Sequence, residues 1–144
     1  MRITREHYLD FVGTLKSEIA ATESRMDLVD RVEGQEWEFD AYYEYQCLEK
    51  TCTWMETILF VFKDTDTWAE FEDLDALKQY VSATEDAYKA MDAYTRTVLP
   101  VDGKPLVGVT GKEWDRIETM RYELRRKTIA WSAFVEFCEY GTIQ

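Results

Sequence analysis

The sequence predicts an all-α fold, an antiparallel four-helix bundle of long helices. Three observations lead to this prediction. Apolar residues recur at alternating spacings of three and four in four successive segments, the pattern of a helix with one buried face. Glycine and proline are scarce, at six and two of 144 residues, so the chain has few breaks. Two of the three links, residues 34–39 and 64–67, are short, which favours antiparallel neighbours within a single domain over residues 1–144; the third, residues 99–109, is longer.

The first two helices follow directly from this spacing. The first is predicted over residues 5–33, with Thr4 as its N-cap and Gly34 as its end. The second is predicted over residues 40–63. Aromatic and polar residues alternate through its first half, so a β-hairpin over residues 36–63 is the alternative that the sequence leaves open. We prefer the helix because the spacing of three and four persists through the whole segment.

The last two helices have clearer boundary signals. The third is predicted over residues 68–99, because a capping box opens with Thr67 just before it. The fourth is predicted over residues 111–140, with Thr110 as N-cap and Gly141 as C-cap. Every signal at the ends of this fourth segment agrees with a helix.

The charge of the chain is strongly negative and concentrated. Its formal net charge is −12, from 29 acidic and 17 basic residues. Residues 33–96 carry sixteen of the acidic and five of the basic residues, which gives −11 for that stretch. Such an excess repels nucleic acid and anionic membranes, so we expect no direct binding to either. A basic protein is the expected kind of partner.

Cysteine usage and apolar runs bear on the cellular setting. The three cysteines form no C-x-x-C pair, so we expect free thiols and neither a disulfide framework nor a zinc site. The N-terminus has no apolar signal-peptide core, and the longest apolar run, residues 58–62, is too short to span a bilayer. These features predict a cytoplasmic protein that holds no cofactor.

The densest acidic run lies between Lys63 and Lys78 and contains no basic residue. If a straight helix begins at Trp68, the phase of its apolar seam turns this indole toward solvent. Alternatively the helix is broken near Asp73 and Trp68 packs inward, which is the interpretation that we prefer. Acids at a helix N-terminus are favoured by the helix dipole, but stabilising pairs would need interleaved Lys or Arg. The run therefore indicates a binding surface.

The leading functional hypothesis is a non-enzymatic inhibitor or binding protein. It would dock an acidic, aromatic-bearing surface on a basic, nucleic-acid-handling partner, because carboxylates one helical turn apart imitate a row of phosphates. Phage anti-defence inhibitors, including anti-CRISPR proteins, and toxin antidotes have this profile. The predicted partner-binding residues are Glu36, Glu38, Asp40, Tyr42, Tyr43, Asp64, Asp66, Trp68, Glu70, Glu72, Asp73 and Asp75.

Two other functions stay open. Glu33-x-x-Glu36 and Glu70-x-x-Asp73 resemble the paired motifs of all-α nucleotide pyrophosphohydrolases, and that resemblance implies carboxylates holding Mg²⁺ on a helical bundle. Gly34 interrupts the first of these pairs at a predicted helix end, so no catalytic or metal-binding residue is assigned. The second alternative is a self-assembling structural protein, a homodimer that pairs through an exposed part of the seams.

Overall fold

The structure, a computed structural model, describes residues 1–31, 39–98 and 110–143. Within these ranges the chain is helical, without a strand, and one isolated β-bridge joins Ile3 to Phe71. The helices are α1 (Arg5–Arg31), α2 (Phe39–Phe62), α3 (Leu74–Val98) and α4 (Gly111–Tyr140), with a short 3-10 helix, η1 (Thr65–Thr67), after α2. The all-α prediction is confirmed, and the β-hairpin alternative is wrong for the part of 36–63 that is described.

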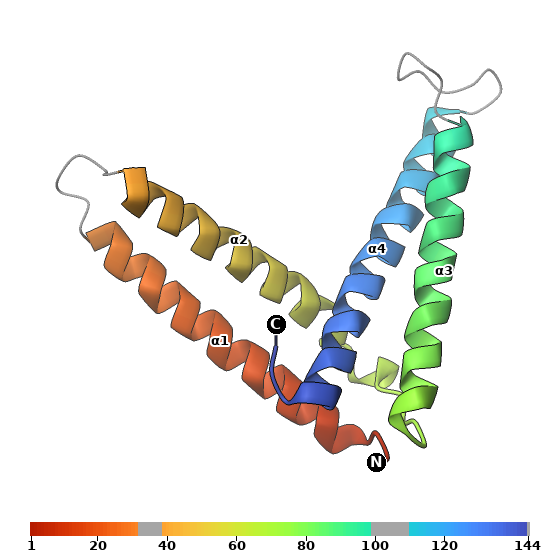
Figure 1. The fold of residues 1–144 in the computed structure, drawn as a ribbon. Helices are drawn as coiled ribbons and strands as arrows, with labels where there is room; N and C mark the ends of the chain where they lie inside the picture. The colour runs from red at the N-terminus through yellow and green to blue at the C-terminus, as the bar shows by residue number, and fades with distance from the viewer. Residues whose placement is uncertain (32–38, 99–109, 144) are drawn as a thin grey trace.

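The four helices form two antiparallel hairpins, α1 with α2 and α3 with α4 (Figure 1). The hairpins meet at one end and diverge toward the other, so that the molecule has the outline of a V. The N-terminal ends of α1 and α3 and the C-terminal ends of α2 and α4 come together at the closed end, where α2 contacts α4. None of the helices within the described ranges is long and apolar enough to cross a membrane.

The core shared by the two hairpins lies at the closed end. Side chains from all four helices are buried there, and many of them are aromatic. Phe11 and Phe62 meet edge to face with ring centroids 5.3 Å apart, and Phe62 and Trp131 lie 5.0 Å apart. The largest fully buried side chains are Trp131, Tyr8, Phe11, Phe62, Phe134, Ile3, Leu15, Ile58 and Leu77. These residues lie near the N-terminal ends of α1 and α3 and the C-terminal ends of α2 and α4, so the core is away from the open ends of the V.

Several predicted helix boundaries are confirmed. The Thr110 side chain accepts a hydrogen bond from the Glu113 backbone N–H at 3.1 Å, and Gly141 ends α4 with a left-handed φ of 75°. Thr4 precedes α1, and its backbone N–H donates to Nδ1 of His7 at 3.1 Å, which satisfies a donor at the helix entrance. The predicted ends of the first and third helices, at residues 33 and 99, lie outside the described residues.

The start of the third helix was predicted wrongly. Helix α3 begins at Leu74, not at residue 68, and Asp73 caps it by accepting the Ala76 backbone N–H at 2.8 Å. Before it, the Thr67 hydroxyl donates to the Asp64 carbonyl at 2.8 Å within the 3-10 turn instead of capping a helix. The break lets Trp68 pack inward, as the preferred interpretation of the acidic run required.

Candidate functional site

The predicted partner-binding residues do not form one surface. Among the described residues they fall into two groups at opposite ends of α2, residues 40–43 and residues 64–75. A helix of 24 residues is about 36 Å long at 1.5 Å per residue, so these two groups lie at different ends of the α1–α2 hairpin. The described part of the first group lies at the open end of the V, and the second group lies at the closed end (Figure 1).

The first group is only partly described. Glu36 and Glu38 lie outside the described residues, and Asp40 belongs to α2 without a described side chain. Tyr42 and Tyr43 are 49% and 62% exposed, so both side chains reach solvent. The described residues of this group thus supply aromatic side chains rather than a cluster of carboxylates.

The second group lies in residues 64–75, the segment that joins α2 to α3 together with the first two residues of α3, which we call the acidic connector. Three of its six carboxylates have structural partners. Asp64 accepts the Asp66 backbone N–H at 3.0 Å, and Asp73 caps α3. Glu70 lies 3.3 Å from Arg2 in an ion pair whose two side chains are at least half exposed, so this pair stabilises the fold little.

The other three carboxylates of the acidic connector are Asp66, Glu72 and Asp75, and all three are exposed. Their side chains make no hydrogen bond or ion pair within the described part of the chain. Carboxylates in this state keep their full charge available to a partner. They are the members of the predicted set whose geometry fits a docking role best.

The backbone of the acidic connector is anchored to the core. The N–H of Ile3 donates to the Phe71 carbonyl at 2.8 Å, and the N–H of Phe71 donates to the Ile3 carbonyl at 3.0 Å. The indole N–H of Trp68 donates to the Phe62 carbonyl at 3.0 Å, and its ring stacks on Tyr8 with centroids 5.4 Å apart. The connector is therefore a fixed element of the fold, with apolar side chains inward and carboxylates outward.

Tyr8 supplies a further anchor for the connector. Its side chain is fully buried, and its hydroxyl donates to the backbone carbonyl of Ala69. Burial raises the pKa of this phenol well above its ordinary value, and the nearby Cys138, Tyr80 and Glu70 raise it further. The hydroxyl therefore stays protonated, and remains a donor, above the pH at which an exposed tyrosine ionises.

An apolar groove adjoins the acidic connector between α1 and α2. Its volume is about 530 Å³, and Trp68 of the connector is part of its wall. Leu9 and Phe60 in the same groove are 44% and 62% exposed. Lys16 and Lys63 line it as well. Exposed apolar side chains grouped in this way are typical of a binding surface.

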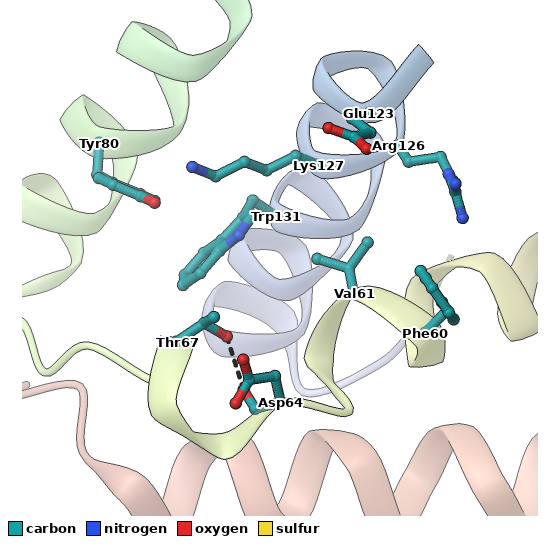
Figure 2. A pocket seen from close by; sticks show the side chains of 9 residues that line it. All are labelled: Phe60, Val61, Asp64, Thr67, Tyr80, Glu123, Arg126, Lys127 and Trp131. Atoms are coloured by element: carbon teal, nitrogen blue, oxygen red, sulfur yellow. Dashed lines mark hydrogen bonds between the residues drawn. The ribbon is translucent and has the colours of Figure 1, made fainter. Parts of the chain in front are cut away.

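A second hollow lies where the hairpins meet, bounded by the end of α2, η1, Tyr80 of α3 and one face of α4. We call it the α2–α4 pocket; its volume is about 790 Å³. Figure 2 shows Lys127 extending toward Tyr80, while Arg126 lies on the side of Phe60. Nζ of Lys127 lies 5.4 Å from the Tyr80 ring centroid, and Cζ of Arg126 lies 4.9 Å from that of Phe60.

One thiol lies beside two carboxylates between α1 and α2. Sγ of Cys52 is 3.6 Å from Oε1 of Glu56 and 4.0 Å from Oε1 of Glu23. Burial raises the pKa of Cys52, and the charges of Glu56 and Glu23 raise it further. Ligand atoms of Glu23, Cys52 and Glu56 all lie within 4.8 Å of one another, so the group has the spacing of a metal cluster.

The carboxylates of the pyrophosphohydrolase-like motif have other contacts in this structure. Glu70 pairs with Arg2, and Asp73 caps α3. Both residues precede the first residue of α3, so the two carboxylates do not lie side by side on a helix. Glu33 and Glu36 lie outside the described residues. The geometry described for this motif therefore offers no support for a magnesium site.

Comparisons with known proteins add no relative to this description. No protein-family model matches the chain, and neither a curated protein nor a solved structure is significantly similar to it. A function for this protein is therefore inferred from its own residues and their geometry.

Sequence reasoning missed the residues of the α2–α4 pocket. One signal could have revealed them, since Arg125, Arg126 and Lys127 are three consecutive bases in an otherwise acidic chain. Neither Arg126 nor Lys127 forms an ion pair with a described residue. Their places beside Tyr80 and Phe60 depend on how the hairpins meet, which the spacing of apolar residues does not specify.

Proposed function

We propose that this protein is a non-enzymatic binding protein that docks its acidic connector and the adjoining apolar groove on a basic protein. The partner chemistry is that of a nucleic-acid-handling protein, whose positive surface the carboxylates would occupy in place of phosphates. Inhibition of that partner is the expected consequence, as in anti-defence inhibitors, including anti-CRISPR proteins, and toxin antidotes. The observation that carries the proposal is the anchoring of an acidic segment to the aromatic core.

Anchoring matters because a flexible acidic tail loses conformational freedom when it binds. The Ile3–Phe71 bridge, the Trp68 indole and the Tyr8 hydroxyl already hold the connector in place. The backbone that carries the carboxylates needs no further ordering on binding, so more of their electrostatic attraction contributes to affinity. Their charge also speeds the encounter with a basic partner.

The adjoining groove supplies the apolar part of such an interface. Stable protein interfaces combine an apolar centre with a polar rim, and aromatic residues often dominate the binding energy. Trp68 belongs to both the connector and the groove, and the exposed ring of Phe60 lies in the same groove. This arrangement supports docking on a folded protein surface.

Affinity capture from the native source tests the proposal. The wild-type protein is compared with a variant in which Asp66, Glu72 and Asp75 are changed to Lys. These three positions are chosen because their side chains have no structural partner among the described residues. We expect a basic protein to be captured by the wild type and lost by the variant, and the affinity of the purified pair to fall steeply with salt.

A matched control separates the connector from net charge. Changing Glu18, Asp27 and Asp86 to Lys alters the net charge by the same amount at exposed positions away from the connector. This control variant should retain the captured partner. Equal loss in both variants, or capture that neither reversal nor salt affects, would contradict the proposal.

A further inference from the structure

A buried thiol and two carboxylates meet where α1 packs against α2. Cys52 is 7% exposed, and its Sγ lies 3.6 Å from Oε1 of Glu56 and 4.0 Å from Oε1 of Glu23. Cys52 and Glu56 are four residues apart on α2 and share one face of that helix, whereas Glu23 comes from α1. We call these three residues the Cys52 cluster. The packing of the α1–α2 hairpin therefore brings one sulfur and two oxygen donors to the same point.

The distances within the Cys52 cluster fit a tetrahedral zinc ion. Zinc binds a thiolate sulfur at about 2.3 Å and a carboxylate oxygen at about 2.0–2.2 Å, so a sulfur and an oxygen on one tetrahedral ion lie about 3.6 Å apart. The two sulfur–oxygen distances of the cluster are 3.6 and 4.0 Å, and all three ligand atoms lie within 4.8 Å of one another. Glu23 is exposed, so a small rotation of its side chain closes the remaining difference.

The two carboxylates of the cluster have no cation as a partner. Glu23 and Glu56 form no ion pair within the described residues, although the chain has 17 basic residues. The thiol has a single proton, which it can donate to only one of them at a time. Two like charges on either side of one sulfur repel each other, and a cation between them turns this repulsion into attraction. The charges of the cluster therefore favour a cationic ligand.

The donor types select the metal. Magnesium and calcium prefer sites made only of oxygen atoms, whereas zinc accepts thiolate and carboxylate ligands together. The expectation of no zinc site was based on the absence of a C-x-x-C pair in the sequence. The Cys52 cluster needs no such pair, because its ligands come from two helices.

We propose that the Cys52 cluster binds one zinc ion, with Cys52, Glu23 and Glu56 as ligands and water in the fourth position. On binding, the thiol of Cys52 releases its proton to solvent, and a zinc–sulfur bond replaces the S–H bond. The ion joins α1 to α2 and stabilises the hairpin, because the unfolded chain does not hold the three ligands together. The cluster is separate from the acidic connector, so it stands or falls independently of the proposed docking function.

The test uses cobalt(II) as a spectroscopic probe of the full-length protein, which is first treated with a chelator. Cobalt bound to a thiolate has a charge-transfer band in the near ultraviolet, which cobalt bound to carboxylates alone lacks. We expect this band to saturate at one cobalt per chain, to disappear when zinc is added and to persist in excess Mg²⁺. Absence of the band, or its loss on addition of Mg²⁺, would contradict the proposal.

Cysteine variants test the sulfur ligand. Cys52→Ala should abolish the band, whereas Cys47→Ala removes an exposed thiol of the same helix and should retain it. Circular dichroism checks that both variants are helical. A band that persists in Cys52→Ala, or equal zinc affinity in the two variants, would mean adventitious binding only and would overturn the proposal.

Glutamine variants test the two carboxylates at exposed positions, where the fold is not at risk. Glu23→Gln and Glu56→Gln should each weaken zinc binding by about tenfold or more, since even changes to groups that only support a metal ligand have effects of that size. Glu49→Gln, at an exposed position of α2 outside the cluster, is the matched control and should leave the affinity unchanged. Titration calorimetry with zinc measures all three, and equal affinities would overturn the proposal.

Discussion

Tyr8 is the residue that links the core to the acidic connector. Its ring stacks on Phe134 with centroids 4.4 Å apart and on Trp68 at 5.4 Å, and it meets Trp131 edge-on at 6.0 Å. Its hydroxyl reaches past these rings to the Ala69 carbonyl. A single side chain therefore fills the aromatic cluster and fixes the connector backbone.

Replacing Tyr8 with Phe tests this link. The ring and its packing are retained, whereas the Ala69 carbonyl loses its donor. We expect the free energy of unfolding to fall by about 1–2 kcal/mol, the usual effect of leaving one buried polar group unpaired. Urea unfolding measures this change. Tyr43→Phe, at an exposed position, is the control and should change stability little; equal effects would contradict the role given to Tyr8.

The thiol of Cys138 should make the free energy of unfolding depend on pH in the alkaline range. Burial raises the pKa of its thiol from 9.0 to about 11 in the folded protein. Between these values the folded state holds a proton that the unfolded state has released. The contribution of this thiol to the free energy of unfolding is therefore fully present below about pH 9 and is lost as the pH rises toward 11. Urea unfolding at several pH values measures this loss.

The control for this prediction is Cys138→Ala, in which the titrating thiol is absent. Its stability should fall less between pH 9 and pH 11 than that of the wild type, although the buried Tyr8 phenol still contributes in the same direction. Parallel loss in the two proteins over this range would show that Cys138 is not the titrating group.

For single residues, the sequence predicts whether a side chain packs inward or stays a free thiol better than it predicts which residues that side chain contacts. The inward packing of Trp68 was preferred because its acidic neighbours and the apolar seam conflicted. Its stacking on Tyr8 was not predictable, because the two residues are far apart in the chain, and its hydrogen bond to the Phe62 carbonyl depends on the 3-10 turn that separates them. The free thiols were expected, and Cys47, Cys52 and Cys138 are all free.

Among the helices, α3 shows most clearly how tertiary packing overrides a local signal. The capping box at Thr67 predicted a helix from residue 68, but the chain forms a 3-10 turn and an anchored connector before α3. Burying Trp68 and Phe71 against the core outweighs the few helical hydrogen bonds that an earlier start would add. Both ends of α4, by contrast, agree with their predicted caps, Thr110 and Gly141.

Asp73 therefore acts as the N-cap of α3, and its replacement tests this boundary. Asp73→Ala should lower the free energy of unfolding by about 1 kcal/mol, the usual loss for a helix N-cap. Thermal or urea unfolding measures it. Glu72→Ala is the neighbouring control and should lie within about 0.5 kcal/mol of the wild type. An unchanged stability in Asp73→Ala would place the start of α3 elsewhere.

On the scale of the whole molecule, the order and antiparallel pairing of the helices follow from the seams and the short links. The V-shaped arrangement does not, because each seam specifies a buried face and not how far along the helix the shared core extends. The large buried side chains of α2 and α4 lie toward their C-terminal ends, and this placement closes one end only. The same geometry creates the α2–α4 pocket.

The central structural claim is that the acidic connector is a rigid part of the closed end. Amide hydrogen exchange tests it most directly, because it reports how often each backbone hydrogen bond opens. We predict that the amides of Ile3, Trp68 and Phe71 exchange as slowly as those of the helices at the closed end, and more slowly than those at the open ends of the V. Exchange of residues 68–71 at the rate of an unstructured chain would contradict the account.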